Sequence, residues 1–230
     1  MMRSNRLAVI GVVALAVAFL TVFAGLRAAS ADDLNKFNHQ QQQDMSLVGT
    51  DDLQARSTYQ PTLHKYGPGR YLLFTGHHAL DVNPVTGQQL PSFNHLTGKY
   101  EPNGTSIVDV SDPKRPKLLV HIPVGASSNT APLTNLGGAQ MVRVCDGNTL
   151  PIHDNKVYML RSYANAAHEI WDVTNPSQPV GVRTVAGGNP VIGAGIGAPG
   201  ALAGTHKSWW ECDSGIAYIV GRRGNDTADG

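Results

Sequence analysis

The sequence predicts an all-β protein, specifically a β-propeller of four-stranded antiparallel blades that is incomplete, with about two and a half blades present. Three observations lead to this class. Short segments rich in β-branched and aromatic residues alternate with turns rich in Gly, Pro, Asn and Asp. The segment 106–116 returns with related residues as 169–179. No helical period is evident beyond the first 31 residues. Regular return of a strand pattern indicates sheets repeated around an axis.

The overall composition excludes two broad functional classes. The 230 residues are 41% hydrophobic and 15% charged, with a formal net charge of +1. This chain is too apolar for a disordered polyelectrolyte, and its near-neutral charge gives no support for a nucleic-acid surface. We therefore expect a globular protein whose partner is another protein or a small molecule, and no nucleic acid.

The first 31 residues have the features of a secretory signal peptide. Arg3 and Arg6 precede an uncharged run over 7–26, and Ala29-Ser30-Ala31 stands directly before Asp32. This order predicts cleavage between Ala31 and Asp32 and a secreted or periplasmic protein. The alternative is a membrane anchor, because the apolar run is long enough to span a bilayer. The chain would contact a membrane only if this segment stays uncleaved.

Residues 32–60 are expected to form a polar lead-in that joins the fold late. The segment includes His39 followed by a run of glutamines over 40–43, and it shows neither a strand period nor a helical period. Residues 61–230 are assigned to the partial propeller.

Each copy of the repeated segment predicts a strand, a tight turn and a second strand. The strands around Asp109 and Asp172 lead into Asp-Pro and Asn-Pro pairs, which start turns because Pro fixes φ and the Asx side chain bonds nearby backbone. Strands over 117–124 and 180–185 follow. Upstream strands begin near Tyr71 and Tyr158, which are aligned as equivalent positions, and further strands are expected over 140–145 and 205–212. The unit therefore has four strands, and a third unit begins around 217–220.

The motif in the first copy resembles a known family. Ile107-Val108-Asp109-Val110-Ser111-Asp112-Pro113 is similar to the core of the LVIVD-repeat family of secreted or surface-associated bacterial proteins. The similarity runs from about Tyr71 onward and includes the segments 167–172 and 204–212. It implies a propeller fold and export, and it implies no particular activity. Tyr158 precedes Asp172 by 14 residues, so the same spacing from Tyr218 passes the last residue, Gly230. We expect an N-terminal portion of a longer propeller.

The two cysteines, Cys145 and Cys212, stand in similar contexts, each followed by Asp. In an oxidising compartment they predict a disulfide. The alternative is two unpaired buried thiols, because a bridge requires the two Cα atoms to lie within about 7 Å.

Strand parity places the long connections on one rim of the sheets. The connections after the second strand and after the fourth strand of each unit share this rim, and they include the long segments 76–104, 125–138 and 186–204. Binding residues concentrate in long loops on rigid scaffolds, so this face is the candidate recognition surface. The candidate residues are His77, His78, His168, Glu169, His206, Trp209 and Glu211.

The residues leave the function open between three hypotheses. The first is a secreted or periplasmic binding or scaffold module with an unknown ligand. The second is a metal-dependent oxidase that uses the rim histidines, because imidazole suits Zn, Cu or Fe and a nearby carboxylate supports acid–base chemistry. No His-Glu-x-x-His spacing occurs, so rim histidines that only bond loop backbone are the simpler reading, and no metal or cofactor is assigned. The third is a truncated chain without function. Trp209 and Trp210 are adjacent on a strand and must point to opposite sides, one into the core and the other toward a ligand or further packing.

Overall fold

The computed structural model describes residues 45–78, 91–125, 138–164, 167–185, 202–203 and 205–223. The expected signal peptide, its Ala31–Asp32 cleavage site and most of the polar lead-in lie outside these residues. The chain divides into two units, Met1–Leu47 and Val48–Gly230, and every strand that the structure describes belongs to the second unit.

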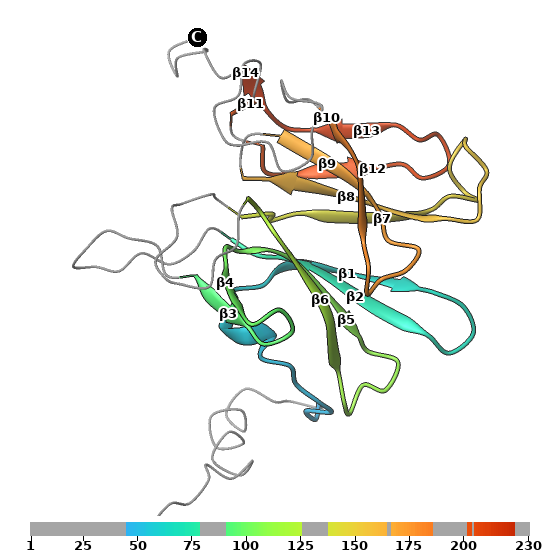
Figure 1. The fold of residues 1–230 in the computed structure, drawn as a ribbon. Helices are drawn as coiled ribbons and strands as arrows, with labels where there is room; N and C mark the ends of the chain where they lie inside the picture. The colour runs from blue at the N-terminus through green and yellow to red at the C-terminus, as the bar shows by residue number, and fades with distance from the viewer. Residues whose placement is uncertain are drawn as a thin grey trace, which may run out of the picture. The chain divides into compact units, whose positions relative to one another are not determined.

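Two four-stranded antiparallel sheets form the body of the second unit (Figure 1). In each sheet the strands lie side by side in the order in which they occur in the sequence, apart from two short strands in the first sheet's long connection, which form a separate pair. The first sheet contains β1 (Tyr59–Lys65), β2 (Tyr71–Gly76), β5 (Gly104–Asp109) and β6 (Lys117–Pro123). The second contains β7 (Val142–Asp146), β8 (Val157–Tyr163), β9 (Ala167–Asp172) and β10 (Val180–Val185). The predicted all-β class with four-stranded antiparallel sheets is confirmed.

Shorter elements complete the described structure. A 3-10 turn, η1, spans Leu53–Ala55. The remaining strands form three antiparallel pairs, which are β3 (Ser92–Asn94) with β4 (Lys99–Glu101), β12 (Ser208–Trp210) with β13 (Ala217–Ile219), and β11 (Leu202–Ala203) with β14 (Arg222–Arg223). The β3–β4 hairpin lies within the long segment that follows β2.

The turns after β5 and β9 have the same hydrogen bonds. Asp109 Oδ1 accepts from the Ser111 amide at 2.9 Å, and Asp172 Oδ1 accepts from the Thr174 amide at 3.0 Å. The Ser111 and Thr174 hydroxyls each accept from the amide that opens the neighbouring strand, both at 3.0 Å. The Asx-Pro sequence therefore produces the same local structure in both sheets, because a carboxylate at the strand end satisfies the first free amide of the turn.

Each sheet also carries one irregularity at the same place in its last strand. The β5–β6 register shifts past Leu119, and the β9–β10 register shifts past Val182. These residues are 63 positions apart, as are Asp109 and Asp172. An extra residue of this kind is a β-bulge, which bends the strand and increases its twist.

The register corrects the alignment of the two tyrosines. Leu72 pairs with Asp109, whereas Tyr158 pairs with Asp172, so Tyr158 corresponds to Leu72. The residue that corresponds to Tyr71 is Val157. The alignment on tyrosine is therefore wrong by one residue, and a shift of one residue moves a side chain to the other face of a sheet.

Part of the expected lead-in is packed into the fold. Leu53 and Arg56 are buried, and β1 begins at Tyr59. The Arg56 guanidinium donates to the carbonyl oxygens of Glu101 and Ser92, both at 3.1 Å, which ties this segment to the β3–β4 hairpin. The segment 53–59 therefore packs beside the first sheet and does not lie free in solvent.

The main core lies between the two sheets. Leu72, Phe74 and Ile107 of the first sheet pack with Val142 and Met159 of the second, and all five are buried. The Thr62 hydroxyl donates to the Val142 carbonyl at 3.1 Å, which joins β1 to β7 directly. On the other side of the second sheet, Leu160 packs with Trp210 of β12. Strand β7 thus contacts β1 on one side and β12 on the other.

The predicted disulfide is present. Cys145 at the end of β7 is bonded to Cys212, which follows β12, with the two Cα atoms 5.5 Å apart. The bond links the second sheet to the β12–β13 pair. Within the described part of the chain, no helix has the length and apolar character needed to cross a bilayer.

Candidate functional site

The two ends of the sheets carry different groups, and we name them separately. The histidine rim is the end at which β1, β5 and β9 begin and β2 and β8 finish. The disulfide rim is the opposite end, at which Cys145 lies. His77 and His78 directly follow β2, His168 is the second residue of β9, and His206 precedes β12 by two residues. The four histidines therefore lie at strand ends that belong to the histidine rim.

Tyr59, His78 and His206 form a cluster on this rim. The Tyr59 ring lies 4.6 Å from the His78 ring and 5.8 Å from the His206 ring, measured between centroids, and both contacts are edge-to-face. All three side chains are partly exposed. Burial lowers the pKa of His206, and the positive charge of Lys207 lowers it further. The His206 imidazole is therefore neutral at pH 7, with one donor nitrogen and one acceptor nitrogen.

His77 is fully buried and belongs to a hydrogen-bonded chain across the first sheet. Its Nδ1 contacts the Ser57 carbonyl, and its Nε2 lies 2.8 Å from Ser106 Oγ. Ser106 Oγ also lies 3.1 Å from His121 Nδ1, and His121 Nε2 lies 3.0 Å from the Pro102 carbonyl. These hydrogen bonds run from Ser57, two residues before β1, to Pro102, directly after β4, and they fix the hairpin against the sheet.

This chain has four contacts and only three protons when both imidazoles are neutral. A carbonyl oxygen only accepts, so His77 Nδ1 and His121 Nε2 each carry a proton. Their other nitrogens are then acceptors, and both face Ser106, whose hydroxyl has a single proton. Burial lowers the pKa of His77 to about 4 and the pKa of His121 well below its ordinary value, and Arg56 adds to both effects. The site therefore does not take up a fourth proton at neutral pH.

His168 is also buried, and one of its nitrogens has no partner. Its Nε2 lies 3.3 Å from the Val220 carbonyl, so Nε2 carries the proton and Nδ1 is left as an acceptor. Nδ1 makes no hydrogen bond, and neither do the buried hydroxyls of Thr205 and Ser208. Lys207, between them, accepts from the Val220 amide at 3.2 Å through its carbonyl. Three unsatisfied polar atoms are thus buried around the start of β12, next to His206.

The Glu169 carboxylate is buried and takes part in contacts that support the fold. Its carboxylate pairs with the Arg161 guanidinium at 2.8 Å, and each side chain is only 1% exposed. Arg161 also donates to the Ile122 carbonyl of β6 at 2.7 Å, and the Trp171 indole N–H donates to Glu169 at 2.8 Å. The pair joins the second sheet to the first, so Glu169 does not present its carboxylate at the rim surface.

Trp209 and Glu211 do not lie with the rim histidines. Trp209 is 57% exposed on the face of β12, while Trp210 is 8% exposed and packs in the core, so the two rings point to opposite sides as predicted. Glu211 follows the far end of β12 and accepts from the Ser214 hydroxyl at 2.9 Å. Glu211 lies five positions after His206, beyond the opposite end of β12, so the structure does not bring its carboxylate to the rim histidines.

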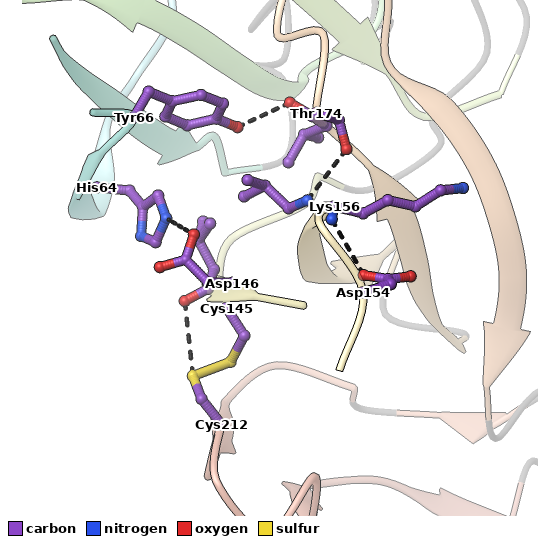
Figure 2. Close-up of polar contacts among 11 residues, drawn as sticks. His64, Tyr66, Cys145, Asp146, Asp154, Lys156, Thr174 and Cys212 are labelled. Atoms are coloured by element: carbon purple, nitrogen blue, oxygen red, sulfur yellow. Dashed lines mark hydrogen bonds and ion pairs between the residues drawn. A yellow bond between two sulfur atoms is a disulfide. The ribbon is translucent and has the colours of Figure 1, made fainter. Parts of the chain in front are cut away.

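The disulfide rim carries a second set of contacts between the sheets (Figure 2). His64 Nε2 of β1 lies 3.1 Å from Asp146 Oδ1 of β7, and the Tyr66 hydroxyl donates to the Val173 carbonyl at 2.7 Å. The Cys145–Cys212 bond lies on the same side (Figure 2). These groups are engaged with one another, so this rim serves to hold the sheets together.

Sequence reasoning missed Tyr59, Ser106 and His121. Tyr59 was assigned to the lead-in because its surroundings are polar. Ser106 and His121 are direct cross-strand partners, which a correct β5–β6 register would have revealed. Among the residues that the structure describes, no group of three or more His, Cys, Asp or Glu side chains is arranged to hold a metal ion.

Comparison of the chain with protein-family models, with curated proteins and with solved structures finds no match.

Proposed function

We propose that this chain is an exported propeller-type module that binds a small neutral hydroxylated ligand, such as a sugar or polyol, at the histidine rim. The two sheets and the β12–β13 pair would be successive blades. Strands β1, β7 and β12 are the first strands of their units, and β7 contacts both others. Contact between the first strands of successive sheets is what radial packing around an axis requires. The disulfide and the signal-like first 31 residues support export.

The observation that carries the binding proposal is the Tyr59–His78–His206 cluster. These residues are far apart in the sequence, yet their rings are in contact and partly exposed at one rim. Residues on loops and strand ends of a rigid scaffold are the usual positions of binding groups. The sheets beneath the cluster are fixed by the Arg161–Glu169 pair and by the buried core.

The chemistry of the rim favours a neutral ligand with hydroxyl groups. The buried acceptor on His168 and the hydroxyls of Thr205 and Ser208 have no partners, and an unpaired buried polar group costs about 1–3 kcal/mol. Ligand hydroxyls both donate and accept, so they can satisfy an imidazole acceptor as well as a protein hydroxyl. The lowered pKa values of His168 and His206 leave both rings neutral at pH 7, so these two side chains add no cationic charge that would favour an anion. Tyr59 provides a partly exposed aromatic ring, whose electron-rich face attracts the C–H groups of a sugar.

Ligand-observed NMR with a fixed panel tests the proposal. The panel contains neutral monosaccharides, disaccharides and polyols, with acetate and inorganic phosphate as the anionic alternative. We expect saturation transfer to at least one neutral hydroxylated compound, and affinity about tenfold lower in Tyr59→Ala and in His206→Ala, a loss of about 1.4 kcal/mol. His153→Ala, an exposed histidine between β7 and β8, is the matched control and should bind as the unmodified chain does.

Two results would contradict the proposal. One is the absence of transfer to every neutral compound in the panel. The other is binding that the two rim variants leave unchanged while their thermal unfolding is normal. Saturation transfer to acetate or inorganic phosphate alone would show that the ligand is an anion and not a neutral hydroxylated compound.

A further inference from the structure

The β12–β13 pair has one covered face and one exposed face. Trp210 and Ile219 point toward the second sheet and pack with Leu160. Trp209 and Tyr218 are direct cross-strand partners on the other face; they are 57% and 55% exposed, and the Arg143 guanidinium of β7 lies 5.4 Å from the centroid of the Trp209 ring. Ile216 and Val220 alternate with Ala217 and Ile219, so they share that face, and they are 52% and 56% exposed. We call these four residues the trailing face of the third unit.

The corresponding faces of the first and second units are both covered by the unit that follows. In the first sheet, Leu72 and Phe74 are 0% exposed because they pack against the second sheet. In the second sheet, Cys145 and Leu160 are 2% and 1% exposed because they pack against the β12–β13 pair. The trailing face therefore continues an interface that the chain forms twice within itself.

A complementary face is exposed at the other end of the series. Leu63 and Leu73 are direct partners on the side of the first sheet that faces away from the second sheet, and Leu63 is 58% exposed. Tyr71, two residues before Leu73, shares this side and is 38% exposed. The partners at the same places in the second sheet are Val144 and Met159, which pack against the first sheet. We call Leu63, Tyr71 and Leu73 the leading face.

We propose that two copies of this chain associate head to tail, with the leading face of one copy on the trailing face of another. Inside the chain, a leading face already packs on a trailing face between the first and second sheets, so the same kinds of surface meet. Contiguous exposed apolar side chains, such as those of the trailing face, mark interaction sites in folded proteins. A contact between two different faces is heterologous, so it builds a ring where the rotation closes and an open chain of copies where it does not.

Light scattering coupled to size-exclusion chromatography tests this association across a concentration series. For the unmodified chain we expect the measured molar mass to exceed that of a single chain and to rise with protein concentration. A trailing-face variant, Trp209→Ser with Tyr218→Ser, and a leading-face variant, Leu63→Glu, should each remain monomeric. Leu96→Ser removes an exposed leucine of the β3–β4 turn and is the matched control, which should associate normally.

Mixing the two blocked variants gives the decisive result. The trailing-face variant keeps its leading face, and the leading-face variant keeps its trailing face, so the mixture should form a one-to-one dimer that does not grow further. A face-to-face dimer between identical surfaces predicts no such complementation. A monomeric unmodified chain at every concentration, or variants that associate unchanged, would overturn the proposal. All substitutions are at exposed positions, so circular dichroism and thermal unfolding should stay close to those of the unmodified chain and verify that the variants fold. Sugar binding at the histidine rim is measured separately, so either proposal can fail without the other.

Discussion

The buried His77 should make the fold sensitive to mild acid. In the folded chain, burial holds the pKa of His77 at about 4, against 6.5 for an ordinary histidine. The native state therefore binds fewer protons than the unfolded state between these two values, and the free energy of unfolding falls as the pH drops from 6.5 toward 4. The difference of about 2.5 pH units at about 1.4 kcal/mol each gives about 3 kcal/mol in total, of which about 2 kcal/mol is lost by pH 5.

Urea unfolding at pH 7.5, 6.5, 5.5 and 5.0 measures this loss. The His77→Gln variant cannot titrate at this position, so its stability should fall by about 2 kcal/mol less between pH 7.5 and pH 5 than that of the unmodified chain. His95→Gln replaces an exposed histidine of the hairpin turn and should preserve the full dependence. His121, whose pKa is also lowered by burial, contributes in the same direction and remains in both variants. Equal pH dependence in His77→Gln and the unmodified chain would refute the reasoning.

Three further substitutions test how the sheets are held together. Cys212→Ser should lower the free energy of unfolding by about 4 kcal/mol, because the bond to Cys145 closes a loop across a sequence separation of 67 residues; urea titration without reductant checks this. Arg161→Met removes the cation that neutralises the buried carboxylate of Glu169 and should cost about 3–5 kcal/mol, whereas replacing both residues by apolar ones should cost less, as thermal unfolding of single and double variants would show. Gly76→Ala should cost about 1–3 kcal/mol, because a Cβ there would strike backbone that precedes the second sheet; unchanged stability would contradict the observed close approach.

The sequence was sufficient to predict the strand–turn–strand units, and the reason is local. The Asp-Pro and Asn-Pro turns are determined by side chains that accept hydrogen bonds from backbone amides two residues later. The local sequences of 109–116 and 172–179 are therefore enough to predict the turns. The pairing of Cys145 with Cys212 was also predictable, because a chain with two cysteines has a single possible intramolecular disulfide.

The features that the sequence did not reveal depend on contacts between distant segments. Strand β1 escaped prediction because its sequence is polar, contains Pro61 and has Gln60 with a φ of 42°, so nothing local favours an extended strand there. Arg56 is buried by a hairpin far along the chain, and its guanidinium donates hydrogen bonds to the carbonyl oxygens of Glu101 and Pro102, which are 45 and 46 residues away. Tyr71 and Tyr158 share an aromatic ring but not a register position, because cross-strand pairing and not residue type decides the face of a sheet on which a side chain lies.

The bulges at Leu119 and Val182 have a consequence for how the chain resists aggregation. Strands β6 and β10 are the last strands of their sheets, so one side of each has no paired strand within its own sheet. A regular free edge is a template on which a foreign strand adds and fibrils grow, but an extra residue breaks the even spacing of amide and carbonyl groups that such a template needs. Pro116 and Pro179, each just before its strand, remove a further donor from the same border. Growth by strand addition is thus hindered along both borders.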